Sequence, residues 1–76
     1  MTAISSTEID FKAIGYLAYA YCGYELKLEV LQSKGFYIGT LNDGLPCSRE
    51  SKEYFRTHQQ ASAALASGDW TQRQYP

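Results

Sequence analysis

The residues best suited to chemistry lie together in Ser48-Arg49-Glu50-Ser51, just after a turn. If this stretch is a strand, Arg49 and Ser51 face one side, while Ser48 and Glu50 face the other. Arg49 then has two possible roles. It either forms a surface ion pair with a neighbouring glutamate, worth about 0–1 kcal/mol, or offers its planar guanidinium to a carboxylate or phosphate. Arg49 and Glu50 are therefore candidates for binding a partner.

None of the groups capable of catalysis has the neighbours that catalysis needs. His58 has no serine or cysteine nucleophile close to it in the sequence. Cys47 has no nearby cation besides Arg49 to favour its thiolate. Glu50 and Glu53 would point to opposite faces of a strand, so they do not form an acid–base pair. We therefore expect no catalytic residue and no enzyme activity.

The sequence also predicts no metal or cofactor site. It holds two cysteines and one histidine, and their spacing matches no zinc-ligand pattern. The arginines Arg49, Arg56 and Arg73 all lie in the second half of the chain, where an electropositive surface would form. Arg73 lies next to Gln72 and is a candidate for polar contacts at the rim of an interface. The formal net charge of −1 argues against a dedicated nucleic-acid binder.

A second candidate for binding is the uncharged stretch AIGYLAYAYCGY at residues 13–24. Helical spacing gives it a core stripe and, beside this, a second row that contains Tyr16 and Tyr19. Tyrosine is enriched in protein interfaces, so the second row could bind a partner or a second copy of the chain. The alternative is that the C-terminal segment covers it. The expected core stripe comprises Phe11, Ile14, Leu17, Ala18 and Tyr21.

Patterning along the chain predicts the elements that position these residues. A helix over 7–22 would begin with a capping box at Ser5 and Glu8 and stop at Gly23. Alternation and turn signals predict three strands and then a second helix capped by Thr57. We expect pairing of the third strand only after Pro46, which lacks an N–H. The expected strands span 24–32, 35–41 and 48–56, the second helix 58–67, and a polar tail 71–76.

The composition is that of one small globular domain. The chain has 76 residues, of which 45% are hydrophobic and 20% charged. The element order α-β-β-β-α predicts an α+β fold, a three-stranded antiparallel sheet with both helices on one face. We expect Cys22 and Cys47 to be reduced thiols of a cytoplasmic protein, because the N-terminal residues show no signal-peptide pattern. The sequence indicates no membrane association.

The order α-β-β-β-α resembles that of the double-stranded-RNA-binding domain. That family contacts phosphates through a lysine cluster at the start of its second helix. Here the corresponding position reads Thr57-His58-Gln59-Gln60, preceded by Arg56, and has no lysine. A nucleic-acid-binding module of this topology is therefore kept as the alternative function, although direct binding of nucleic acid is not what the residues favour.

A second resemblance is carried by short motifs between residues 36 and 73. The matching pieces are FYIGT at 36–40, DG at 43–44, SRES at 48–51, EYF at 53–55 and GDWTQR at 68–73. This pattern resembles small uncharacterised proteins of bacteria and phages. The resemblance implies a compact, non-catalytic protein-binding module. Its expected role is that of a phage or mobile-element inhibitor or adaptor that blocks a host protein or ribonucleoprotein complex, for example a CRISPR effector.

Overall fold

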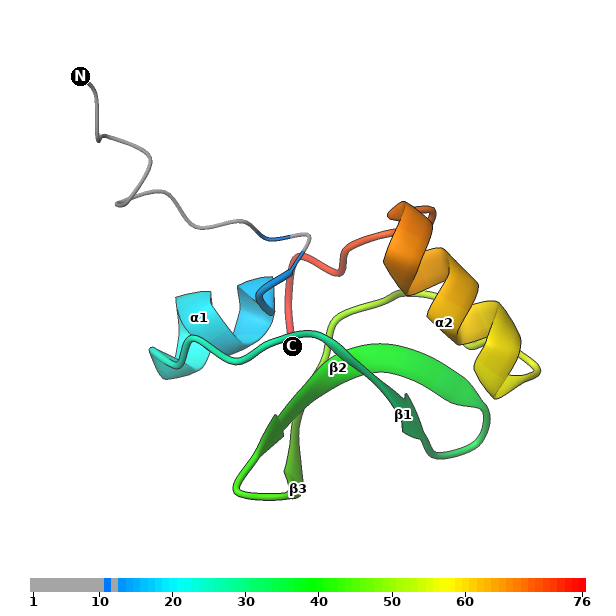
Figure 1. Cartoon of the computed structure of the whole chain (residues 1–76). Coiled ribbons are helices and arrows are strands. Elements are labelled where there is room, and N and C mark those ends of the chain that lie inside the picture. The colour runs from blue at the N-terminus through cyan, green and yellow to red at the C-terminus, as the bar shows by residue number, and fades with distance from the viewer. Residues whose placement is uncertain (1–10, 12) are drawn as a thin grey trace.

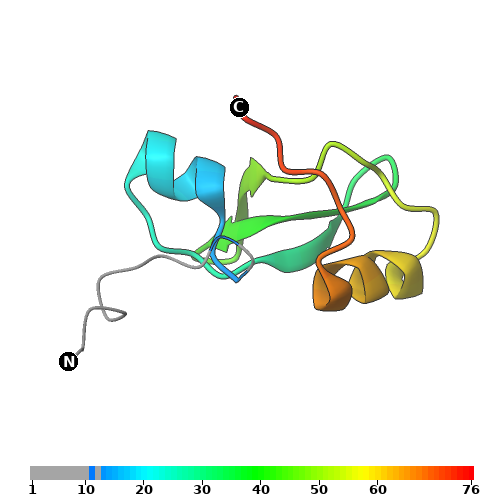
Figure 2. The same cartoon turned by 90° about the horizontal axis from the view of Figure 1, so that it is seen from above.

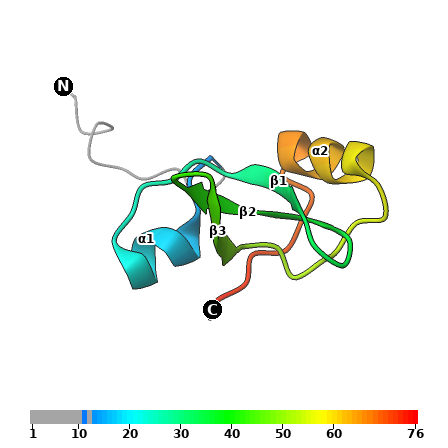
Figure 3. The same ribbon diagram turned by 90° about the horizontal axis from the view of Figure 1, so that it is seen from below.

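The computed structural model describes residue 11 and residues 13–76, and it confirms the predicted α+β fold (Figure 1). The two helices lie at opposite ends of the sheet in all three views (Figures 1, 2 and 3). The elements, in chain order, are α1 (Tyr16–Cys22), β1 (Glu29–Gln32), β2 (Phe36–Asn42), β3 (Leu45–Arg49) and α2 (His58–Ser67).

The sheet is an antiparallel meander in the order β1-β2-β3. β2 is its central strand and agrees with the predicted 35–41 to within one residue at each end. The turn from β2 to β3 is made by Asp43 and Gly44, whose φ angles are 55° and 79°. A two-residue turn with positive φ at both positions matches the twist of a hairpin, which explains the Asp-Gly pair.

Both helices pack on the same face of the sheet, as predicted. Ile38 and Thr40 are two residues apart on β2, so their side chains point to one face. Ile38 is fully buried and packs with Leu28 and with Ala64 of α2. A Cβ on Gly15, the residue before α1, would lie 2.5 Å from the Thr40 methyl carbon, so the start of α1 lies against the same face.

Helix α2 has the predicted bounds and the predicted capping residues. The Thr57 hydroxyl accepts a hydrogen bond from the Gln60 backbone N–H at 3.0 Å. The Gln60 side chain in turn accepts from the backbone N–H of Arg56 at 3.1 Å, one residue before the usual capping-box donor. Gly68 ends the helix in the left-handed conformation with φ 78°.

The first helix is shorter than the predicted 7–22. Ser5 and Glu8, the expected capping box, lie outside the described residues. Residues 13–15 are extended and pair with residues 26–28, through hydrogen bonds from Gly15 N–H to Leu26 O (2.9 Å) and from Leu28 N–H to Ala13 O (2.8 Å). These hydrogen bonds pair backbone groups of residues 13–15 without forming a helix. Gly15 therefore lies outside the helix interior, where a glycine would reduce stability.

The pairing with residues 13–15 also shortens the first strand, predicted over 24–32. Only Glu29–Gln32 forms a ladder with β2, because residues 26–28 pair with residues 13–15 instead. The expected alternation holds at Leu28, which is buried, but Tyr24 is 48% exposed. Alternation of apolar and polar residues therefore predicts extended backbone, but it does not predict which segment that backbone pairs with.

The third strand begins earlier and ends earlier than the predicted 48–56. Pro46 pairs with Leu41, and Thr40 pairs with Ser48, so Cys47 is an extra residue on β3. A β-bulge of this kind lets a strand accommodate proline, because the regular ladder is interrupted there. The expectation that pairing resumes only after Pro46 is therefore wrong.

Beyond Arg49 the regular ladder with β2 is interrupted, and a paired bridge to β2 forms again at Phe55, opposite Phe36. The backbone N–H groups of Glu50 and Ser51 both donate to Ile38 O, at 2.8 and 3.0 Å. The Ser51 hydroxyl then substitutes for a backbone acceptor, taking a hydrogen bond from Ile38 N–H at 3.0 Å. This second irregularity ends β3 and turns the following residues out of the sheet.

The C-terminal segment, predicted as a polar tail over 71–76, runs back beside this turned segment. Lys52 N–H donates to Thr71 O at 2.8 Å, and Arg73 N–H donates to Glu50 O at 2.7 Å. Trp70 packs against the core cluster of Leu28, Ile38 and Ala64. Among the residues that the structure describes, no helix is long and apolar enough to cross a membrane.

Candidate protein-binding surface

The carboxylate of Glu50 is the best-connected polar group in the described chain, and it is fully buried. One oxygen accepts from Leu17 N–H (2.9 Å) and from the Gln72 amide (2.7 Å). The other accepts from Ala18 N–H (3.1 Å) and from the Ser48 hydroxyl (2.5 Å). Burying a carboxylate costs free energy unless its oxygens are hydrogen-bonded, and here four donors satisfy it.

Glu50 supplies the cap that α1 lacks locally. Gly15 precedes the helix and offers no side-chain hydrogen bond to its first turn. The first amide groups of a helix need acceptors and favour negative charge, and the Glu50 carboxylate, just after β3, accepts hydrogen bonds from two of them. The expectation that Glu50 contacts a partner does not fit this burial, and we correct it to an internal structural role.

The face of the sheet away from the helices carries a stack of aromatic rings and one cation. The Tyr37 ring lies close over Gly39, where a Cβ would be 2.9 Å from the ring. Tyr54 meets Tyr37 edge-on, with centroids 5.8 Å apart. The Arg49 guanidinium carbon lies 4.7 Å from the Tyr54 ring centroid, within the range of a cation–π contact. Arg49 is therefore held in one orientation on this face.

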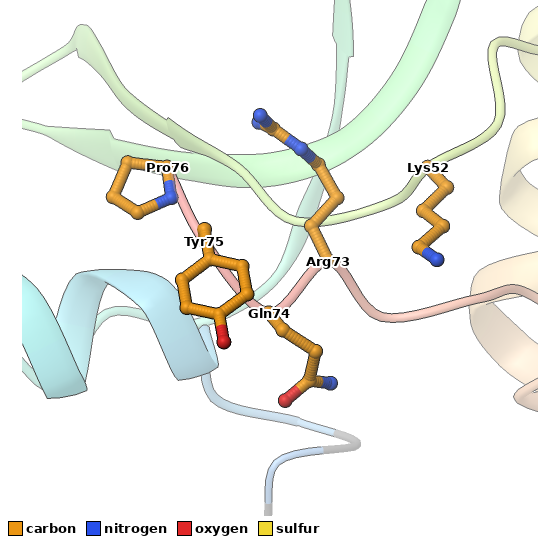
Figure 4. A pocket seen from close by; sticks show the side chains of 5 residues that line it. All are labelled: Lys52, Arg73, Gln74, Tyr75 and Pro76. Atoms are coloured by element: carbon orange, nitrogen blue, oxygen red, sulfur yellow. The ribbon is translucent and has the colours of Figure 1, made fainter.

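The Arg73 guanidinium and the backbone of Lys52 lie next to Arg49. Arg73 donates from Nη1 to the backbone oxygen of Arg49 at 3.0 Å, and Arg49 Nη1 lies 3.2 Å from the backbone oxygen of Lys52. Lys52 and Arg73 line an open pocket of about 340 Å³ together with Gln74, Tyr75 and Pro76 (Figure 4). Figure 4 shows Lys52 and Tyr75 on opposite sides of Arg73.

We call this region the basic surface: Arg49, Lys52, Tyr54, Arg73 and Tyr75. The hydrogen bonds recorded for its two guanidinium groups go to backbone carbonyl oxygens. These bonds orient the guanidinium groups, and their acceptors are uncharged. Tyr54 and Tyr75 are 42% and 74% exposed, so aromatic area is available beside the cations. Such a surface can bind carboxylate groups with aromatic contact around them.

The carboxylate of Glu53 borders the basic surface, and it is held by the C-terminal segment. Both of its oxygens accept from Thr71 N–H, at 2.9 and 3.1 Å. Partial burial opposes its ionisation, but the hydrogen bonds from Thr71 and the charge of Lys52 outweigh burial and lower its pKa below the usual value. Glu53 is therefore already engaged when a partner approaches.

The tyrosine row on α1 is covered in part by the chain itself. The Phe11 ring meets Tyr16 edge-on at 5.3 Å and Tyr19 at 5.8 Å between centroids. The predicted core stripe holds at Leu17 and Ala18, but Phe11 packs on the second row instead. Tyr21 is 52% exposed, and its hydroxyl donates to Gln74 O at 3.3 Å. The extended backbone at 13–15 breaks the helical spacing on which the stripe was based.

The remaining sequence candidates lie elsewhere. Arg56 is exposed just before α2 and is not among the residues of the basic surface. His58 is exposed in the first turn of α2, where its ring meets Phe36 edge-on. Burial raises the pKa of the Cys47 thiol, which disfavours the thiolate. Within residues 11 and 13–76, no group of three or more His, Cys, Asp or Glu side chains could hold a metal ion.

Sequence reasoning found Arg49 and Arg73 but missed Lys52, Tyr54 and Tyr75. Their grouping depends on the turn after Arg49 and on the return of the C-terminal segment, and neither leaves a local pattern. Gln72 was noted only as a neighbour of Arg73, although its amide completes the Glu50 cap. Comparison with protein-family models, curated proteins and solved structures gives no match, so the surface is interpreted from its own geometry.

Proposed function

We propose that this chain is a small, non-catalytic protein-binding module that docks an acidic segment of a partner on its basic surface. The observation that carries the proposal is Arg49, fixed over the Tyr54 ring at 4.7 Å beside Lys52 and Arg73. Preorganised guanidinium groups bind carboxylates with directed hydrogen bonds and lose little side-chain entropy.

The absence of catalysis in this proposal is supported by how the reactive groups are used. The Glu50 carboxylate is occupied by four donors, so it has no free site from which to move a proton to a substrate. The raised pKa of Cys47 works against nucleophilic attack.

For the biological role, we propose an inhibitor or adaptor of a phage or mobile element, acting in the cytoplasm. The support is the resemblance of the FYIGT, SRES and GDWTQR motifs to small phage-borne proteins. A protein of this kind would act by occupying a surface of a host complex, such as a CRISPR effector, that the complex needs for its own contacts.

Capture of partners from the native host tests the binding function. Lys52→Glu reverses one charge of the basic surface without removing any hydrogen bond recorded for its side chain. Its matched control is Lys34→Glu, an exposed lysine in the turn between β1 and β2. We expect wild type and Lys34→Glu to retain the same protein, identified by mass spectrometry, and Lys52→Glu to lose it. Equal capture by both variants would exclude the basic surface as the docking site.

Two other functions, nucleic-acid binding and self-association, each have a supporting observation and a direct test. A cationic surface with exposed tyrosines also suits nucleic acid, in which case wild type would bind duplex RNA directly. The partly covered row of Tyr16 and Tyr19 could instead join two copies of the chain. Sedimentation of purified protein would then give a dimer, which Tyr19→Ala would weaken.

A further inference from the structure

Cys22 and Cys47 are far apart in sequence, but the packing of α1 on β3 brings them together. The first turn of α1 is bonded to Glu50 just after β3, through Leu17 N–H. Cys22 lies five residues further along α1, about 8 Å at a rise of 1.5 Å per residue. Cys47 lies three residues back from Glu50, about 10 Å at strand spacing. Helix α1 packs against β3, so the two cysteines lie on neighbouring elements.

The side-chain contacts agree with this arrangement. The Cys22 thiol and the Thr40 hydroxyl both lie close enough to the Cys47 thiol to influence its pKa. Cys47 is the extra residue of the bulge between Ser48 and Pro46, so its side chain is released from strict alternation. It therefore meets Thr40, which lies on the face that carries the helices. Both cysteines are free thiols, Cys22 exposed and Cys47 half-buried.

We propose that Cys22 and Cys47 form a site of reversible oxidation, at which a small-molecule disulfide such as oxidised glutathione converts the two thiols into one intramolecular disulfide. The Cys22 thiolate attacks one sulfur of the small disulfide and expels a small thiolate. Cys47 then loses its proton to solvent and attacks the Cys22 sulfur, expelling the second small thiolate. Two protein thiols are oxidised by two electrons, and one disulfide is reduced to two thiols.

The order of attack follows from the surroundings of the two thiols. Cys22 is exposed at the end of α1, where a small disulfide can reach it. Cys47 is half-buried, and burial raises its pKa, so it suits the role of the resolving thiol, which acts once its neighbour is modified. The product would tie the end of α1 to the bulge of β3.

Reaction of the reduced, full-length protein with oxidised glutathione tests the proposal. After alkylation of remaining thiols, we expect a monomer that has lost the mass of two hydrogens and carries no alkyl group. Peptide mapping should join the peptides of Cys22 and Cys47. The oxidised monomer should melt about 10 °C above the reduced form. A stable glutathione adduct on Cys22 with Cys47 still alkylated would overturn the proposal, as would disulfides formed only between molecules.

A second experiment tests whether the fold itself brings the two thiols together. In denaturant the same chain must close a flexible loop before the second thiol can attack. We therefore expect the glutathione adduct of wild type to resolve at least about tenfold faster in the native protein than in denaturant. Equal rates would show that the fold does not bring the thiols together. Cys47→Ser should stop at the adduct, which identifies Cys22 as the first site of attack.

Discussion

At the scale of single residues, Glu50 is predicted to contribute strongly to the stability of the fold. Glu50→Gln keeps the size of the side chain, but its NH₂ group faces a donor and its negative charge is lost. We expect it to lower the free energy of unfolding by about 2–4 kcal/mol in urea titrations. The matched change Glu53→Gln, at a carboxylate near the surface, should cost less than about 1 kcal/mol near neutral pH. Similar losses for both variants would contradict the role of Glu50 as the cap of α1.

Gly15 is the second residue with a specific steric requirement. An added Cβ would lie 2.5 Å from the Thr40 methyl carbon and 2.8 Å from a Glu50 oxygen. We expect Gly15→Ala to destabilise the protein by about 1–3 kcal/mol. The double variant Gly15→Ala/Thr40→Ser removes the nearest methyl group and should recover part of the loss relative to Thr40→Ser alone. A double-mutant cycle of urea midpoints measures this coupling, and strict additivity would refute it.

The lowered pKa of Glu53 predicts a pH dependence of stability. Because its pKa is lower in the folded protein, ionised Glu53 adds stability near neutral pH. That contribution is lost as the pH falls through the folded pKa, below the ordinary value of 4.5. Urea unfolding of wild type should therefore lose stability more steeply below this pH than unfolding of Glu53→Gln. Parallel curves for the two proteins would show that the Thr71 hydrogen bonds add no net stability.

At the scale of elements, α1 separates buried from exposed side chains. Leu17 is 2% exposed, and Leu17→Ala should cost about 2–5 kcal/mol. Tyr19 is 40% exposed, and Tyr19→Ala should cost about 1 kcal/mol or less. Tyr16→Ala should fall between them, because Phe11 packs on its ring. Thermal melting of the three variants checks this order, and a loss for Tyr19→Ala as large as for Leu17→Ala would place the row in the core.

The elements also show what sequence patterns can predict. The bounds of α2 follow from Thr57 and Gly68, which act within one turn of the helix. The Asp43-Gly44 turn is equally local. By contrast, the start of α1 depends on Glu50 and the end of β3 on Ser51, whose partners lie far away in the sequence. Local patterns therefore predicted the fold class, the element order and the last residues of α1 and β1, but not the first residues of α1 and β1 or either end of β3.

The same limit applies to the binding surface. The sequence pointed to Arg49 and Arg73 because a guanidinium group can bind carboxylate or phosphate. No sequence pattern points to Lys52, Tyr54 or Tyr75. Arg49→Ala and Arg73→Ala are not selective tests of binding. Each side chain donates to backbone oxygens, so both changes should lower stability as well. Lys52→Glu is the cleaner probe of binding.

At the scale of the whole molecule, the charge balance predicts weak contact with nucleic acid. With a net charge of −1 and a few clustered cations, we expect duplex RNA or DNA to bind no tighter than about 10⁻⁵ M at physiological salt. Fluorescence anisotropy over a salt series measures this. Sub-micromolar affinity that weakens steeply with salt would instead support the nucleic-acid-binding alternative.

The cap of α1 also bears on the order in which the molecule assembles. Leu17 and Glu50 are 33 positions apart, and Glu50 and Gln72 are 22 apart. Such contacts raise the contact order, and each requires a large loop to close before it stabilises anything. During synthesis α1 leaves the ribosome long before Glu50 and Gln72 do, so the carboxylate that caps this short helix is not yet present. We therefore expect α1 to be among the last elements to become ordered, although it is the first in the chain.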